Sequence, residues 1–380
     1  MILTKLFNDF FNSERASGII LIGCTIFSLV ATNLFPGYFE IWHFSFAGHS
    51  VTHWVNDGLM AIFFLLIGLE LEREVYIGEL SSVKNALLPA IAALGGMLLP
   101  ASIYYFINRN GGDTRGVGIP MATDIAFALG ALSLLGKRVP PSLKVFLTAL
   151  AVIDDLGAIL VIAIFYTSTL SWVNLGIAAG IFLILFVLNR LKIYTLWPYL
   201  IGGIIMWYFM LHSGVHATIT GVLLAFVIPF GNGGEASISY KLQQFLHKPV
   251  AFIILPVFAL ANTSIPIEGD FFLAFGSTIS IGIMAGLLIG KPLGIFVFSY
   301  ATVKLKLSSL SSDIAWKHIL GAGILGGIGF TMSIFISILA FDNETLIDQA
   351  KMSIMLISTV SGALGFIYLR SVLKGEATET

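Results

Sequence analysis

The stretch "LTALAVIDDLGAILVIAIF", residues 147–165, is an apolar run that contains two adjacent carboxylates. About 20 mostly apolar residues are needed for an α-helix to cross the roughly 30 Å hydrocarbon layer of a membrane. Similar runs recur along the whole chain, which is 57% hydrophobic and only 11% charged over 380 residues. The sequence therefore predicts an all-α polytopic membrane protein with a single transmembrane domain over residues 1–380, in which Asp154 and Asp155 need an explanation.

The chain has twelve such runs, and its basic residues predict their orientation. If both termini are cytoplasmic, sixteen of the 20 Lys and Arg residues fall on the cytoplasmic side, three fall outside, and Lys291 lies within a span. This asymmetry follows the positive-inside rule and predicts an even number of spans. The approximate limits are 14–34, 54–72, 86–107, 116–136, 142–167, 172–189, 196–211, 214–230, 245–262, 272–302, 316–341 and 350–370.

The segments outside the spans carry further expectations. Residues 1–13 are expected to form a cytoplasmic surface helix, 35–53 an extracellular hairpin loop, and 371–380 a cytoplasmic tail. Cys24 is the only cysteine, so no disulfide framework is expected. The formal net charge of −1 gives no reason to expect a nucleic-acid partner.

Four ionisable residues cannot easily reach water: Asp124, Asp154, Asp155 and Lys291. Three helices carry them at similar depth from their cytoplasmic ends: Asp124 is 13 residues before Lys137, Asp154 is 13 after Pro141, and Lys291 is 13 before Lys304. That depth is about 20 Å, near mid-membrane, where a charge costs about 3 kcal/mol. A structural ion pair is one explanation, but three carboxylates exceed what one lysine needs. Adjacent residues point about 100° apart on a helix, so Asp154 and Asp155 are expected to face different neighbours. One such arrangement places Asp154 toward Lys291 and Asp155 toward Asp124.

Two spans contain residues that interrupt a helix. The fourth has Pro120 followed by Thr123 and Asp124, and the eleventh has glycines at 321, 323, 326, 327 and 329. Irregular backbone at membrane depth must line a cavity or be buried in protein, and paired broken helices indicate a transporter site. The two spans are the centres of spans 3–5 and 10–12, which predicts two inverted three-helix repeats. Close helix packing is the alternative explanation of the glycines.

Several motifs resemble those of the NhaA family of bacterial Na+/H+ antiporters. They are "ATDIAFALG" (122–130), "AVIDDLGAI" (151–159), "IGKPLGI" (289–295), "VNDGLMAIFFLLIGLELERE" (55–74) and "HSGVHATITG" (212–221). The resemblance implies twelve spans whose broken helices 4 and 11 cross near mid-membrane. It also implies a chain in the bacterial inner membrane that exchanges Na+ or Li+ for protons, with membrane lipids around it and no cofactor.

The resemblance also implies a role for each matching residue. Asp155 and Asp154 would bind the ion and exchange protons, and Lys291 would be their paired or proton-exchanging lysine. Asp124 and Thr123 would lie at the crossing of the broken helices. The remaining implied residues are Asp57 in the external funnel and Glu70, Glu74 and His216 in the region that tunes the response to pH.

Residues 40–51, "EIWHFSFAGHSV", alternate apolar and polar side chains and predict a β-hairpin. In the NhaA family such a hairpin helps form a homodimer, which is therefore expected here. One departure concerns regulation, because Gln243 and Gln244 occupy positions near the ninth span where the family pattern has an acidic residue. The pH profile is therefore expected to differ from the usual alkaline activation.

Competition for one site would produce the exchange. Carboxylates desolvated by burial bind protons well, and their oxygens also suit a hard cation. If both aspartates lose protons to bind one Na+, the cycle is electrogenic; a proton released by Lys291 would give the same count. A Na+-coupled solute symporter is the alternative, but residues around the site are mostly small and aliphatic. An intramembrane aspartyl protease is a further alternative, but this sequence does not contain the GxGD motif that it requires. A passive channel would not need three buried aspartates.

Overall fold

The computed structural model describes residues 14–167, 170–267 and 274–376. The contacts divide the chain into two compact units. Unit 1 comprises the residues up to 23, 82–158 and those from 267 onward, and unit 2 comprises 24–81 and 159–266. The surface helix expected over 1–13 and residues 377–380 of the expected tail lie outside the described residues. The last helix continues to Glu376.

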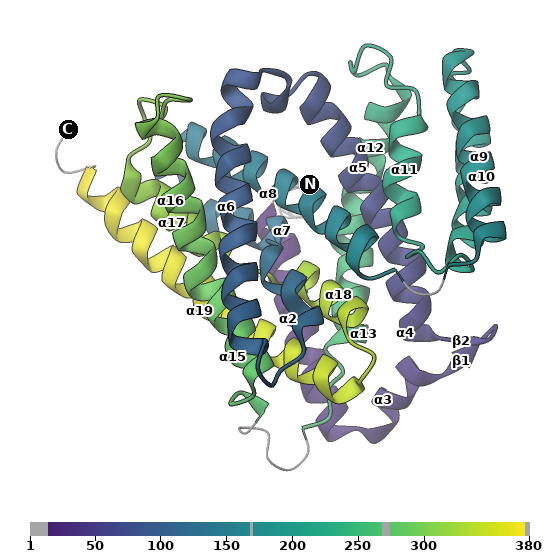
Figure 1. Ribbon diagram of the computed structural model, residues 1–380, viewed down its shortest axis with the longest axis horizontal. Coiled ribbons are helices and arrows are strands. Elements are labelled where there is room, and N and C mark those ends of the chain that lie inside the picture. The colour runs from purple at the N-terminus through teal and green to yellow at the C-terminus, as the bar shows by residue number, and fades with distance from the viewer. Residues whose placement is uncertain (1–13, 168–169, 268–273, 377–380) are drawn as a thin grey trace, which may run out of the picture. The chain divides into compact units, whose positions relative to one another are not determined.

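Unit 1 is built from helices that pack along much of their length. In Figure 1, α6, α16, α17 and α19 lie side by side, in agreement with their contacts. Unit 1 contains α6 (Val83–Asn108), η3 (Thr114–Met121), α7 (Ile125–Ser133), η4 (Gly136–Arg138), most of α8 (Pro141–Phe165), α15 (Thr278–Ala285), η6 (Gly286–Gly290), α16 (Lys291–Lys304), α17 (Trp316–Gly326), α18 (Phe330–Ala340) and α19 (Glu344–Glu376).

Unit 2 combines long apolar helices with a small two-stranded sheet. It contains most of α2 (Glu14–Leu34), α3 (Pro36–His43), β1 (Ser45–Phe46), β2 (His49–Ser50), α4 (Val51–His53), η1 (Trp54–Leu59), α5 (Met60–Tyr76), η2 (Glu79–Ser81), α9 (Trp172–Arg190), α10 (Trp197–Leu211), α11 (Ile219–Val227), α12 (Ile238–Pro249), η5 (Val250–Ile254) and α13 (Leu255–Asn262).

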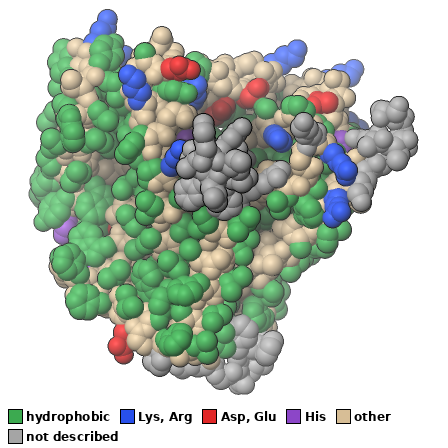
Figure 2. Space-filling view, turned by 180° about the vertical axis from the view of Figure 1, so that it is seen from behind, with side chains coloured by type: hydrophobic (Ala, Val, Ile, Leu, Met, Phe, Trp, Pro, Cys, Tyr) green, Lys and Arg blue, Asp and Glu red, His purple; other side chains and the backbone are tan. Residues whose placement is uncertain are grey.

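The helices have the length and composition of membrane spans. Within the described residues, nine helices meet that test, or ten if the bent pair α17 and α18 counts as one span. Helix α10, with 15 residues, and helix α11, with nine, are shorter, so the eighth predicted span is a helix only over 219–227. Hydrophobic side chains cover much of the surface drawn in Figure 2. The chain is a polytopic membrane protein, and the count of twelve spans stays a prediction.

Both interruptions predicted within helices are present. The predicted fourth span consists of η3 and α7, separated by extended backbone at Ala122–Asp124. The eleventh consists of α17 and α18, bent by 47° at residues 327–329. The two breaks meet, because the Asp124 N–H donates to the Ile328 carbonyl at 2.7 Å. Each break thus satisfies part of the backbone that the other leaves without a helical partner.

The packing of α6 against α16 positions Lys291. A Cβ on Gly294 would overlap the Gly95 carbonyl, so the two backbones approach more closely than any larger residue permits. The turn before Lys291 is π-helical over Gly286–Gly290. Pro292 explains this irregularity, because proline has no N–H with which to continue the α-helical bonding. Lys291 therefore projects from a locally widened turn of a closely packed helix pair.

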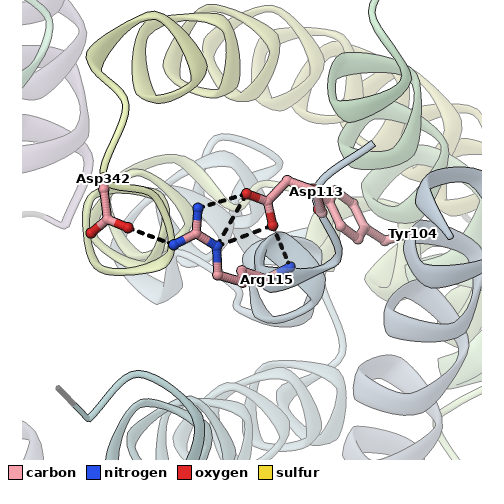
Figure 3. A network of polar contacts seen from close by, with 4 residues as sticks. All are labelled: Tyr104, Asp113, Arg115 and Asp342. Carbon is pink, nitrogen blue, oxygen red and sulfur yellow. Dashed lines mark hydrogen bonds and ion pairs between the residues drawn. The ribbon is translucent and has the colours of Figure 1, made fainter. Parts of the chain in front are cut away.

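A clamp of opposite charges joins the ends of the two broken spans that lie away from the breaks (Figure 3). Arg115, in the first turn of η3, contacts Asp113 through Nη2 at 2.8 Å and Asp342, just after α18, through Nη1 at 2.6 Å. The Tyr104 hydroxyl donates to the Asp113 carbonyl at 2.8 Å. Deeper in unit 1, Ser333 of α18 donates to the Ile119 carbonyl of η3 at 2.7 Å.

The β-hairpin is shorter than its sequence pattern indicates. Strands β1 and β2 pair Ser45 with Ser50 and Phe46 with His49, and the turn uses positive φ angles at Ala47 (50°) and Gly48 (86°). Such a turn favours glycine because it has no Cβ. The expected strand over residues 40–43 is wrong, since helix α3 continues to His43 there.

Candidate ion-binding site

Asp154 and Lys291 form a fully buried ion pair in unit 1. The Lys291 Nζ lies 2.7 Å from Asp154 Oδ2, and both side chains are 0% exposed. Lys291 also donates to the Met121 carbonyl at the end of η3. The predicted orientation of Asp154 toward Lys291 is therefore confirmed. An isolated charge in a nonpolar medium is strongly destabilising, so this contact lowers the free-energy cost of burying each of the two charges.

Thr123 links the ion pair to the break of the second interrupted helix. Its hydroxyl lies 2.8 Å from Asp154 Oδ2 and 2.9 Å from the Gly326 carbonyl oxygen. A hydroxyl has one proton to donate, so it serves one of these acceptors at a time. The extended backbone at 122–124 allows this position, because it turns the side chain of Thr123 out of the helix and toward α8.

The second carboxylate of the pair is also buried. Asp155 is 1% exposed and interacts electrostatically with the Lys291 ammonium. Among the described residues, Oδ1 of Asp154 has no hydrogen-bond partner. A buried acceptor of this kind is costly unless a proton or a cation satisfies it. The site thus contains carboxylate oxygens, a hydroxyl and irregular backbone carbonyls, which are the ligand types that hard cations prefer.

Asp124 lies where two helices begin. Its Oδ1 accepts from the Phe127 N–H at 3.1 Å, which caps α7, and its Oδ2 accepts from the Thr331 N–H at 3.0 Å in the first turn of α18. The Thr331 hydroxyl donates to the same oxygen. Helix N-termini carry partial positive charge, so one carboxylate here stabilises both. Thr331 was missed from the sequence, although it follows the last glycine of the interrupted span by only two positions.

The remaining predicted residues fall in unit 2, in two separate groups. Glu70 lies 3.0 Å from His247 Nε2, and Glu74 accepts from the Glu79 N–H at 3.0 Å. Asp57 interacts electrostatically with His216 and lies beside His53. Sequence reasoning missed His247 and His53. Their positions relative to a carboxylate follow from the packing of α12 against α5 and from the irregular turn at η1.

Comparison with known proteins decides the family. Residues 8–369 match the family described as Na+/H+ antiporter 1. The chain belongs to this antiporter family. It is 61% identical over 375 residues to Na(+)/H(+) antiporter NhaA 1 of Flavobacterium johnsoniae, with 98% of each chain covered. It is 60% identical to Na(+)/H(+) antiporter NhaA of Flavobacterium psychrophilum, covering 100% of this chain and 99% of the relative.

The same antiporter name recurs at lower identity. Na(+)/H(+) antiporter NhaA of Cytophaga hutchinsonii is 59% identical, with 98% of this chain and 97% of the relative covered. The chain thus spans nearly the whole length of these antiporter relatives. The resemblance inferred from the motifs around Asp124, Asp154 and Lys291 is confirmed, and the comparisons offer no support for the symporter alternative.

Proposed function

We propose that this chain is a secondary active Na+/H+ antiporter of the bacterial inner membrane. The observation that carries the proposal is the buried group of Asp154, Asp155, Thr123 and Lys291 beside two meeting helix breaks. The antiporter names of relatives over 98% of the chain support it. Both termini are proposed to be cytoplasmic, as the distribution of Lys and Arg predicts.

The exchange is proposed to arise from competition at the carboxylates. A buried carboxylate satisfies its charge by binding a proton or a cation, since leaving the charge bare is costly. Na+ or Li+ would bind between Asp155 and Asp154, with Thr123 close enough to contribute its hydroxyl. Binding displaces the protons, and return of the site to the other side allows them to rebind.

Two routes for the second proton remain. In the first, Asp154 and Asp155 each release one proton when a single Na+ binds. In the second, Lys291 releases its proton as Asp154 turns from the ammonium to the cation. Both routes move one net charge per cycle, so the exchange is proposed to be electrogenic, and a membrane potential contributes about 2.3 kcal/mol per charge for each 100 mV.

Asp124 and Thr331 are proposed to support the crossing rather than to bind the ion. The carboxylate of Asp124 accepts from the backbone at both helix starts, and the Thr331 hydroxyl adds a further hydrogen bond. The site therefore keeps two helix ends at a fixed distance from Asp154. Loss of either polar group would misplace the ligands without removing one.

The groups in unit 2 are proposed to regulate and gate the transport. Asp57 would lie on the external pathway, and Glu70, Glu74 and His216 would tune the response to pH. His247, which contacts Glu70, joins this proposal. The buried Gln243 cannot change its charge, so the activation pH is proposed to differ from that of relatives with an acid there. A homodimer through the short hairpin is proposed as the assembly.

The decisive experiment measures proton movement in sealed liposomes. Purified protein is reconstituted with an acidic interior and a trapped pH dye, and Na+ is added outside with and without an imposed voltage. Alkalinisation that depends on Na+ and responds to voltage is the expected result. Asp155→Asn should abolish it, because the amide can neither release a proton nor balance the charge of Na+.

The matched control is Asp348→Asn, which changes a partly exposed carboxylate on α19 that lies 3.9 Å from Lys351. It should exchange Na+ for protons at the wild-type rate. Normal Na+-dependent proton flux in Asp155→Asn would refute the site assignment, and absence of flux in the wild-type chain would refute the antiport itself.

A further inference from the structure

A histidine contacts the carboxylate of Asp57 in unit 2. The Nδ1 atom of His53 lies 3.3 Å from Asp57 Oδ2, and the two side chains are 35% and 18% exposed. The residues are one turn apart at the junction of α4 with the π-helical η1. The Trp207 indole donates to the Asp57 carbonyl at 2.9 Å, which holds this irregular turn in place.

The second ring nitrogen of His53, Nε2, is buried and has no hydrogen-bond partner within the described part of the chain. When Nδ1 carries the hydrogen that faces Asp57, Nε2 of the neutral ring holds the free lone pair. A proton can therefore be accepted at Nε2 and another released from Nδ1. Imidazole performs this shuttle readily near neutral pH.

A second histidine lies against the first. The rings of His49 and His53 stack with centroids 4.2 Å apart and an interplanar angle of 12°, and the edge of Trp54 packs on His49. Two imidazolium charges at this separation repel each other. A proton that arrives on His49, in the hairpin, therefore favours release of the proton from His53, while His49 also interacts electrostatically with Asp57 itself.

The other titratable groups around this turn have different engagements. His43 of α3 stacks on Phe39 at 4.0 Å, and His216 Nε2 lies 2.8 Å from the Tyr166 carbonyl oxygen. His216 reaches Asp57 through electrostatic interaction. Helix α13, which packs on η1, carries no titratable side chain, and α3 adds Glu40. Of the histidines, His53 is the one with an ion-pair contact to Asp57.

We infer that His53 and His49 form a proton relay that loads and unloads Asp57 on the hairpin side of the membrane. The inference rests on the proposed Na+/H+ exchange, to which it adds a path for protons between the hairpin and Asp57. In the forward step the Nδ1–H bond of His53 breaks as an O–H bond forms on Asp57. An imidazolium and a carboxylate become a neutral imidazole and a neutral carboxylic acid, so charge and atoms balance.

The test uses the full-length chain in liposomes with dilute, bulky buffer, where delivery of protons limits the rate. His53→Gln should slow Na+-dependent proton flux on the order of tenfold, less than loss of a fully positioned acid–base group, because water still reaches Asp57. Imidazole, a small diffusible proton carrier, should restore most of the rate. His49→Gln should be slowed less and be restored in the same way.

The matched control is His43→Gln, which should leave both the rate and the imidazole response at wild-type values. A wild-type rate for His53→Gln in dilute buffer would overturn the relay, as would a slowed rate that imidazole does not restore, since that result assigns a packing role. If His53→Gln does not fold, His49→Gln decides by the same two criteria. No Na+-dependent flux in the wild-type chain would instead overturn the exchange, and the relay with it.

Discussion

The pair of Lys291 with Asp154 and the clamp around Arg115, both in unit 1, differ in their access to water. Lys291 and Asp154 are 0% exposed, whereas the Arg115 side chain is 51% exposed and that of Asp342 is 92% exposed. The distances are nearly equal, 2.7 Å in the first and 2.6 Å in the second. Water screens exposed charges and solvates each partner when the contact opens, so similar geometry has unequal consequences. Burial, more than distance, decides what loss of a partner costs.

The largest effect is expected from removing one member of the buried pair. Lys291→Gln should destabilise the protein by about 3–5 kcal/mol, because it leaves the Asp154 carboxylate buried without its cation. Thermal unfolding of the purified protein measures this loss.

The double variant Lys291→Gln with Asp154→Asn is its control. It should recover much of the lost stability, since neither residue is then charged. Wild-type stability in Lys291→Gln alone would contradict the comparison, because it would mean that the lysine contributes nothing to holding Asp154.

An intermediate effect is expected at the hydrogen bond between Thr331 and Asp124, beside the site. Thr331→Val keeps the shape of the side chain but removes the hydroxyl that donates to Asp124. The cost should be about 1–3 kcal/mol, because a buried carboxylate oxygen loses one of its donors. Thr359→Val on the exposed side of α19, where the hydroxyl bonds only its own helix, should change the unfolding temperature little. Equal shifts in the two variants would show that burial does not set the cost here.

The smallest effect is expected from the exposed clamp. Arg115→Gln should cost less than about 1 kcal/mol near neutral pH, and added salt should reduce the difference further. Unfolding temperatures of both proteins at low and high salt measure this. If Arg115→Gln lost as much stability as Lys291→Gln, and the loss did not depend on salt, then burial would not explain the difference between the buried pair and the clamp.

The difference in stability between the wild type and Arg115→Gln should also depend on pH. Partial desolvation acts to raise the pKa of Asp113, but the hydrogen bonds and charge of Arg115 outweigh it and leave that pKa below its ordinary value. A depressed pKa contributes stability above the unfolded pKa, which is lost as the pH falls through the folded value. Wild type and Arg115→Gln should therefore converge in acid.

The charged motif residues of unit 1 could be predicted from the sequence because charged residues are rare within membrane spans. Asp124, Asp154, Asp155 and Lys291 stand out in apolar runs, and their equal depths predicted a common site. The pairing of Asp154 with Lys291 was one of the arrangements that the adjacent aspartates allowed, and the structure shows that it is the one present. Thr331 was missed because a threonine in an apolar helix normally bonds its own backbone and has no distinctive pattern.

The local irregularities could not be predicted in the same way. Residues 40–51 were predicted as a hairpin, yet α3 occupies 40–43, where Ile41 and Trp42 are adjacent and interrupt the alternation. The π-helical turn at η1 contains no proline and depends on neighbouring helices that stabilise a widened turn. His53 and Asp57 are separated like any i, i+4 pair, and only the packing around η1 makes them neighbours of His49.

The sequence by itself determined that this chain lies in a membrane, which spans are interrupted and which of them carry charge. These properties are local, because the hydrocarbon core contains no water. A polar side chain or an unpaired backbone group is therefore costly at whatever position it occurs. Only the tertiary structure decided which atoms meet: Thr331 reaches Asp124 from 207 residues away, and Lys291 reaches the Met121 carbonyl from 170 residues away. Such contacts depend on the close approach of helices, here at Gly95 and Gly294, and that approach is a property of two surfaces together.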